Sequence, residues 1–135
     1  MSSQIFLNIP VKDLPKSVSF FTALGFKFNP QFTDEKATCM IINDHAFVML
    51  LVEPFFQTFT PKSLVNAHQS TEAMIGISVE NPEKVDEMVN TAIASGGTEA
   101  RAPQDLGFMY TRSVNDPDGH IWEFFWMDPS GMAPQ

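Results

Sequence analysis

Apolar and polar residues recur along the first half of the chain in an order that predicts a strand, a helix and then three strands. Alternating apolar residues over 5–11 predict the first strand. Asp13 is placed to cap a helix over 14–24, and Gly25 is placed to end it. The apolar positions at helical spacing are Leu14, Val18, Phe21 and Leu24. Three strand-like runs follow, at 26–32, 37–42 and 46–52.

The second half of the chain repeats this order. Residues 74–79 predict a strand, after which Asn81 is placed to cap a helix with Pro82 in its first position. The apolar stripe of this helix consists of Val85, Met88, Val89, Ala92 and Ile93. Gly96 and Gly97 end the helix, and three strand-like runs follow at 99–102, 108–114 and 120–126. We therefore predict an α+β fold of two βαβββ modules, each with a mixed sheet.

The segment between the two halves has a different character. Residues 53–72 contain prolines and scattered polar residues, which indicate a connector. Phe55, Phe56 and Phe59 have the spacing of a short helix, and they form either a plug over a core or a lid over a ligand pocket. We divide one domain, residues 1–135, into a first module of about 4–52, a connector of about 53–72 and a second module of about 73–127.

Each predicted sheet has a second face that its helix does not cover. If the two sheets curl and meet edge to edge, these faces enclose a cup. Polar side chains are mixed with apolar ones on these faces, as in a ligand cavity and unlike a pure core. The predicted cavity residues are Phe6, Asn8, Val48, Leu50, Met74, Gly76, Ser78, Met109, Thr111, Ser113, Glu123 and Phe125.

Glu123 is the candidate catalytic residue, because it lies in the middle of the aromatic last strand. A carboxylate on a largely buried strand requires a partner, a proton, a metal or a wet cavity. As a general base it would abstract a proton beside a carbonyl group. Alternatively, it accepts hydrogen bonds from Asn8, Ser78 or bound water. Parity along the neighbouring strand puts Tyr110 and Arg112 on the opposite face, and the sequence assigns no role to Arg112.

Composition narrows the classes of partner and compartment. A net charge of −8 argues against nucleic acid, because affinity for a phosphate backbone is built on Lys and Arg. No apolar run is long enough to span a bilayer, the N-terminus lacks a signal-peptide pattern, and Cys39 is the one cysteine, so we expect a cytoplasmic protein without a membrane partner. The 13 Phe and 8 Met residues suffice for a core and for a soft apolar cavity.

Two motifs resemble the vicinal oxygen chelate superfamily, which includes glyoxalase I, bleomycin and fosfomycin resistance proteins and extradiol dioxygenases. They are Ile9-Pro10-Val11-Lys12-Asp13-Leu14, followed by Leu24-Gly25-Phe26, and Asp116-Pro117-Asp118-Gly119-His120-Ile121-Trp122-Glu123. The resemblance covers nearly the whole chain. It implies paired βαβββ modules forming a cup, and a homodimer.

The resemblance also implies where a divalent metal would be bound. The four ligand positions of the superfamily fall on Phe6, near Leu50, on Met74 and on Glu123, and Glu123 alone has a ligating side chain. The histidines, His45, His68 and His120, fall on none of these positions. We therefore predict no cofactor, with a divalent metal as the alternative.

The sequence leaves three functions open. The favoured one is a small-molecule-binding protein that binds or sequesters an apolar or cationic ligand without the metal set. The second is an enzyme, namely a glyoxalase-like lyase or isomerase that uses Glu123 as general base or residual metal ligand; a dioxygenase is disfavoured. The third is a structural or interaction protein whose cup is filled by its own side chains.

Overall fold

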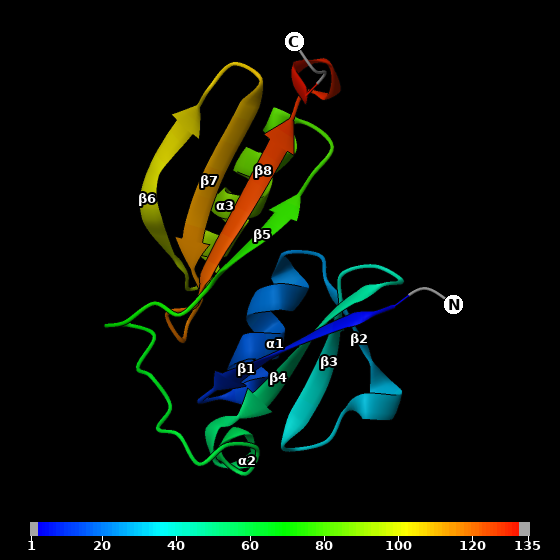
Figure 1. The fold of residues 1–135 in the computed structure, drawn as a ribbon, viewed down its shortest axis with the longest axis vertical. Helices are drawn as coiled ribbons and strands as arrows, with labels where there is room; N and C mark the ends of the chain where they lie inside the picture. The colour runs from blue at the N-terminus through cyan, green and yellow to red at the C-terminus, as the bar shows by residue number, and fades with distance from the viewer. Residues whose placement is uncertain (1–2, 133–135) are drawn as a thin grey trace. The chain divides into compact units, whose positions relative to one another are not determined.

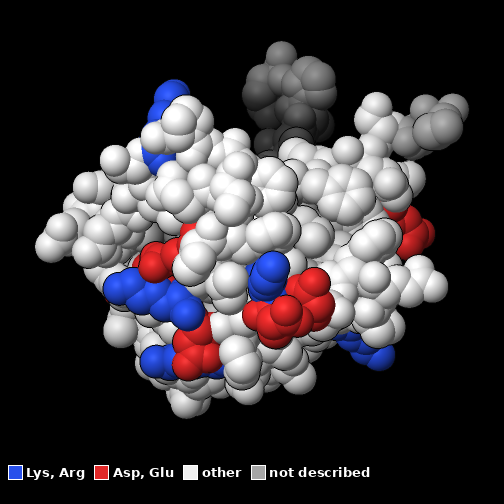
Figure 2. All heavy atoms as spheres, turned by 90° about the horizontal axis from the view of Figure 1, so that it is seen from below, with Lys and Arg blue, Asp and Glu red and all other residues white. Residues whose placement is uncertain are grey.

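The computed structural model describes residues 3–132, and the chain forms two compact units, Met1–Leu64 and Val65–Gln135. Each unit contains one four-stranded mixed sheet and one longer helix (Figure 1). None of the helices in the described part of the chain has the length and apolar character that crossing a membrane requires. On the face drawn in Figure 2, Lys and Arg side chains lie next to Asp and Glu side chains.

In the first unit the sheet has the strand order β1-β4-β3-β2. The elements are β1 (Ile5–Val11), α1 (Leu14–Ala23), β2 (Lys27–Asn29), the 3₁₀ helix η1 (Pro30–Phe32), β3 (Ala37–Ile41), β4 (Ala46–Val52) and α2 (Glu53–Gln57). Strand β1 runs parallel to β4, and the other pairs are antiparallel. The short helix α2 contacts β1 and β4. It lies where the spacing of the connector phenylalanines predicts a helix.

The second unit repeats this topology with the strand order β5-β8-β7-β6. Its elements are β5 (Met74–Ser78), α3 (Pro82–Ala94), β6 (Thr98–Asp105), β7 (Met109–Asn115), β8 (Ile121–Met127) and the 3₁₀ helix η2 (Pro129–Met132). Strand β5 is parallel to β8, and the other pairs are antiparallel. The α+β fold of two repeated βαβββ modules is thus confirmed. The cup that would join the two sheets stays a prediction.

Both long helices begin at the residues that the sequence predicts, and both end just before the predicted glycines. Asp13 Oδ1 accepts a hydrogen bond from the backbone N–H of Lys16 at 3.1 Å, and Asn81 Oδ1 accepts one from the N–H of Lys84 at 2.7 Å. After each helix the backbone turns through a positive φ, 99° at Gly25 and 113° at Gly96. A residue without Cβ adopts this conformation at no steric cost, so the caps and glycines fix the helix bounds locally.

Several details of the prediction are wrong. The expected strand over 26–32 is a strand only at Lys27–Asn29, because Asn29 accepts a hydrogen bond from the N–H of Gln31 at 2.9 Å and starts a 3₁₀ turn instead. Pro30 has no N–H to donate to a neighbouring strand. In α3 the expected apolar stripe is buried except for Ile93, which is 40% exposed.

The core of the second unit lies between α3 and one face of its sheet. Val85 and Val89 of α3 are fully buried, as are Val114, Trp122 and Phe124 of the sheet. In the first unit Leu14, Phe21 and Leu24 of the predicted α1 stripe are buried, but Val18 is only half-buried, and Ser17 and Phe20 are buried in addition. Strand β3 is buried on both faces, at Thr38 and Met40 on one side and at Cys39 on the other.

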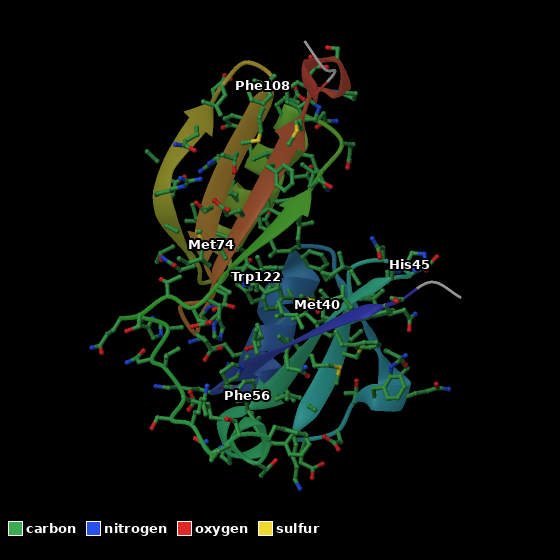
Figure 3. All side chains as sticks on the ribbon, in the orientation of Figure 1. Met40, His45, Phe56, Met74, Phe108 and Trp122 are labelled. Carbon is green, nitrogen blue, oxygen red and sulfur yellow. The ribbon has the colours of Figure 1, made fainter. Side chains whose placement is uncertain are left out.

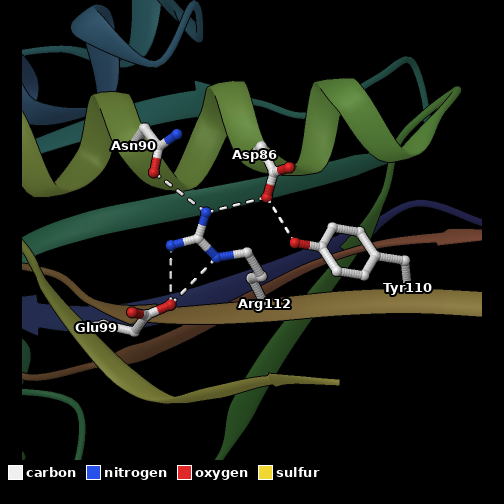
Figure 4. Close-up of polar contacts among 5 residues, drawn as sticks. All are labelled: Asp86, Asn90, Glu99, Tyr110 and Arg112. Carbon is white, nitrogen blue, oxygen red and sulfur yellow. Dashed lines mark hydrogen bonds and ion pairs between the residues drawn. The ribbon is translucent and has the colours of Figure 1, made fainter. Parts of the chain in front are cut away.

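Arg112 joins α3 to the sheet (Figure 4). Its guanidinium donates to Asp86 at 3.0 Å and to Asn90 at 3.1 Å, both on α3, and to Glu99 of β6 at 2.9 Å. Tyr110 Oη donates to the same Asp86 carboxylate at 2.6 Å. The Arg112 side chain is only 11% exposed. Arg112, to which the sequence assigned no role, therefore connects α3 to the sheet on the side of the core.

This network predicts a pH dependence. The hydrogen bond from Tyr110 lowers the pKa of Asp86 below its usual value of 3.8, and Arg112 lowers it further, while burial opposes both. Because the carboxyl has the lower pKa in the folded chain, its contribution to stability is complete above about pH 4 and is lost as the pH falls through the folded pKa. We expect the difference in unfolding free energy between wild type and Asp86→Asn to be constant near neutral pH and to shrink below about pH 4. Urea titrations across this range test it; a difference that grows in acid would contradict the prediction.

Candidate functional site

The second sheet has a face opposite α3, which we call the distal face. Strand register places one residue of each strand in a single row across it, in the order Gly76, Glu123, Ser113 and Arg101. The neighbouring positions on this face are Met74, Ser78, Met109, Thr111, Ile121 and Phe125. The sequence-based parity of the predicted cavity residues of this module is therefore correct: they share one face. Whether they line a ligand cavity stays a prediction.

Glu123 has a partner that the sequence did not reveal. Its Oε2 accepts a hydrogen bond from Arg101 Nη2 at 2.9 Å, as part of an ion pair. The side chains of Glu123 and Arg101 are 22% and 48% exposed, so the carboxylate is the more buried member. Arg101 lies within the predicted strand 99–102, but the register of β6 shifts on both sides of it. Simple alternation could not assign its face for that reason.

Ser113 lies between the two charged residues in the row and has the most unusual environment of the site. Its side chain is 1% exposed, and its Oγ is buried without a hydrogen-bond partner among the described residues. A hydroxyl in this state costs roughly 1–3 kcal/mol, so unsatisfied buried groups are rare and call for an explanation. Thr111, one pleat away, is also buried. The row thus contains a carboxylate, a hydroxyl and a guanidinium side by side.

The margin of the distal face is apolar and accessible. Met74, at the start of β5, is 61% exposed, and Phe108, just before β7, is also exposed at the other end of the sheet (Figure 3). Gly76 and Ser78 are exposed as well. At Gly76 an added Cβ would come within 3.4 Å of the Phe125 ring, which is ordinary contact. A small molecule can therefore reach the β5 end of the row.

In the first unit the predicted cavity residues do not all lie on one face of the sheet. Phe6 stacks on Phe47 with ring centroids 4.8 Å apart, and Asn8 lies beside Met49. Val48 and Leu50 instead lie beside Leu7 and Ile9, on the opposite face of the sheet, and both are buried. The prediction that Val48 and Leu50 share a face with Phe6 and Asn8 is therefore wrong. Asn8 Nδ2 donates weakly to the carbonyl of Phe6, at 3.4 Å.

The turn before β8 holds this strand, which carries Glu123, in place. Asp116 is buried, and its carboxylate accepts hydrogen bonds from the N–H groups of Asp118 at 2.9 Å and His120 at 3.0 Å and from Trp122 Nε1 at 3.0 Å. Burial raises the pKa of Asp116, although these hydrogen bonds and the neighbouring His120 lower it. At Gly119 φ is +91°, and a Cβ would meet the backbone of His68 at 2.7 Å. These contacts hold the start of β8, the strand that contains Glu123.

A hollow of about 190 Å³ borders this turn, with the lining residues Ala67, His68, Gly96, Thr98, Asn115, Asp116, Pro117 and Gly119. Its one carboxylate, Asp116, is already used by three N–H donors. The hollow therefore reflects the packing of the turn against residues 67–68.

The side chains present do not fit a divalent metal. Phe6 and Met74 carry no hard nitrogen or oxygen donor, and neither do the β4 residues on the face of Phe6, which are Phe47, Met49 and Leu51. Within residues 3–132, no three His, Cys, Asp or Glu side chains come together as a metal site would need. His45 lies in the turn before β4, His68 in the segment before β5, and His120 just before β8.

Comparison with known proteins identifies proteins that this chain resembles in sequence and in fold. The family described as bleomycin resistance protein-like N-terminal matches residues 4–43. The hypothetical protein SA1046 from S. aureus is 33% identical, with 93% of this chain and 95% of that chain covered and a TM-score of 0.79. No curated protein matches the sequence.

Two further solved structures share the fold at lower identity. A glyoxalase/bleomycin resistance protein/dioxygenase family enzyme from Burkholderia phytofirmans is 17% identical over 93% of this chain and 99% of its own, with a TM-score of 0.77. The fosfomycin resistance protein FosX from Mesorhizobium loti is 11% identical over 97% of both chains, with a TM-score of 0.69. With its two βαβββ modules and its Asp-Pro-Asp-Gly turn, the chain belongs to the vicinal oxygen chelate superfamily, the group of glyoxalases, bleomycin resistance proteins and dioxygenases.

Proposed function

We propose that this protein binds or sequesters a small molecule with an apolar part and a cationic group, on the distal face of its second sheet and without a metal. The observation that carries the proposal is the row of Glu123, Ser113 and Arg101, in which polar groups lie among half-buried apolar side chains with the exposed Met74 at the margin. Specific ligand sites combine a mostly apolar lining with a few placed polar groups. Glu123 is the anchor for the cation.

The side chains at the metal positions of the superfamily support binding without a metal. Proton abstraction beside a carbonyl in this superfamily relies on a metal to stabilise the enolate, and Phe6 and Met74 cannot hold one. We therefore favour binding over a lyase or isomerase activity. In line with the superfamily, we propose a homodimer in the cytoplasm that binds no nucleic acid.

The proposal predicts that an aromatic cation binds through Glu123. Phenethylammonium is expected to raise the melting temperature of the wild-type protein, because a ligand that binds only the folded state stabilises it. A hydrogen bond to a charged group contributes about 1.5–3 kcal/mol, so Glu123→Gln should weaken binding about ten- to a hundredfold. Isothermal titration calorimetry measures the affinity directly.

Glu87→Gln is the matched control. Glu87 lies on α3, its side chain is 66% exposed, and it pairs with Lys84 at 3.4 Å. The same loss of charge there should leave the affinity for phenethylammonium unchanged. If Glu123→Gln binds the cation as tightly as wild type does, the site is elsewhere and the proposal fails.

A further inference from the structure

We propose that the ligand is a zwitterion of the amino-acid type with an apolar side chain, whose carboxylate pairs with Arg101 and whose ammonium group pairs with Glu123. This inference rests on the proposed function and specifies the chemistry of the same site. The argument uses three observations: the ion pair lies directly across Ser113, the Ser113 hydroxyl has no partner among the described residues, and Gly76, next to Glu123 in the row, is exposed.

The Arg101 side chain crosses a whole strand to reach its partner. Arg101 is on β6, Glu123 is on β8, and β7 lies between them with Ser113 in register with both. Neighbouring strands are about 4.8 Å apart, so β6 and β8 are separated by about 10 Å. A contact of 2.9 Å over this span requires the arginine to extend across Ser113. The ion pair therefore forms a bridge above the serine hydroxyl.

This bridge explains why Ser113 is buried but does not satisfy it. The Oγ has no hydrogen-bond partner among the described residues although charged groups lie on both sides of it. A buried hydroxyl without a partner is unfavourable, and a ligand group that bonds to it recovers the missing interaction. Ser113 thus marks the middle of the row as a position where a polar ligand atom gains a hydrogen bond.

The bridge can open at little cost. Arg101 is half exposed and belongs to β6, the edge strand of the sheet, whose residues are almost all exposed and whose register shifts on both sides of Arg101. Ion pairs with this exposure contribute little to stability, because water and salt screen them. Moving the guanidinium away from Glu123 therefore requires no change in the core of the unit.

A zwitterion suits the opened row better than a single ion does. A cation alone would pair with Glu123 but would displace Arg101 and then lie next to an unpaired positive charge. An anion alone would pair with Arg101 and lie next to an unpaired Glu123. A molecule with both groups replaces each partner of the bridge, so no charge near the sheet is left unpaired. Charge pairing in the row therefore discriminates between ligand classes.

The positions beside the row are suited to the apolar part of such a molecule. Gly76 adds no side chain next to Glu123, and Phe125 and Ile121 flank Glu123 on the same face of β8. Met74 lies beside Ile121 and is largely exposed. When the ammonium group is bound at Glu123, an aromatic or aliphatic ligand side chain can extend along Ile121 and Met74. It then buries apolar surface on these residues.

Three probes with the same ring test the charge requirement: L-phenylalanine, phenethylammonium and hydrocinnamate. By calorimetry with the wild-type protein, L-phenylalanine is expected to bind at least about tenfold more tightly than either single ion, because it makes one more charge-assisted contact. Arg101→Gln should remove this advantage and make phenethylammonium the best of the three. Glu123→Gln should make hydrocinnamate the best. Ser113→Ala should weaken L-phenylalanine several-fold and leave the ranking of the probes unchanged.

The outcomes separate this inference from the proposed function. If phenethylammonium binds wild type as tightly as L-phenylalanine does, and Glu123→Gln abolishes its binding, the cation site stands and the zwitterion inference is overturned. If none of the three probes binds wild type at millimolar concentration, both are overturned. Glu87→Gln, outside the site, must keep the wild-type ranking. Circular dichroism confirms that each variant is folded, as the exposure of Arg101 leads us to expect.

Discussion

Replacement of Asp116 with alanine is expected to lower the free energy of unfolding by about 3 kcal/mol, since a buried donor that loses its acceptor costs roughly 1–3 kcal/mol and two part-buried donors lose theirs as well. The Asp116 carboxylate accepts from two backbone N–H groups and from Trp122 Nε1, and Trp122 is itself 1% exposed. Part of this loss is offset, because the removed charge was buried, as the raised pKa of Asp116 shows. Urea denaturation followed by circular dichroism measures the change.

Two companion variants show whether the loss of an acceptor for these three donors is responsible. Asp116→Asn keeps one acceptor oxygen for the N–H groups of Asp118 and His120 but turns the other position into a donor, so it should cost less than alanine does. Asp34→Ala removes the same kind of acceptor in an exposed turn, where Asp34 accepts from Lys36 and Ala37 and water can replace it. The expected order of destabilisation is Asp116→Ala, Asp116→Asn, Asp34→Ala. An Asp34→Ala variant as unstable as Asp116→Ala would contradict this explanation.

The helices and the second module were predictable because local chemistry determines them. Asp13 and Asn81 cap helices through their own side chains, and the glycines that follow the helices adopt positive φ whatever packs around them. On β8 alternation alone predicted the faces correctly, since Glu123 interrupts an otherwise apolar run and marks one side, and the faces of β7 follow the same alternation. Because β7 and β8 pair without a shift in register, paired residues of the two strands lie on the same face of the sheet.

The predictions about the site that failed concern residues whose position depends on contacts between elements. The alternation of apolar and polar residues along a strand does not encode these contacts. Strand β4 has apolar residues on both faces, so no polar residue marks the side of Val48 and Leu50, and only the pairing with β1 assigns it. Arg101 was missed because β6 is irregular on both sides of it, and a shift of one residue reverses the face. Arg112 bonds to three residues that are distant in sequence, which no local pattern reveals.

Replacement of Arg112 with methionine is expected to lower the free energy of unfolding by about 2–3 kcal/mol, because hydrogen bonds to charged groups contribute about 1.5–3 kcal/mol and several are lost together. Methionine keeps the apolar stem of the side chain but none of its donors. The loss stays below that of a fully buried ion pair, because the carboxylates of Asp86 and Glu99 are 47% and 36% exposed and water can solvate them.

Arg101→Met is the matched control for Arg112→Met, because both arginines are on the second sheet and both pair with a carboxylate at about 3 Å. Their exposure differs, 48% against 11%, and exposed pairs contribute about 0–1 kcal/mol. Urea denaturation should therefore show a large loss for Arg112 and a loss below about 1 kcal/mol for Arg101. Equal losses would mean that Arg101 supports the fold, and the bridge over Ser113 could then not open as cheaply as zwitterion binding requires. Stability and ligand preference thus assign the two arginines opposite roles, one that fastens α3 to the sheet and one that is free to exchange its partner.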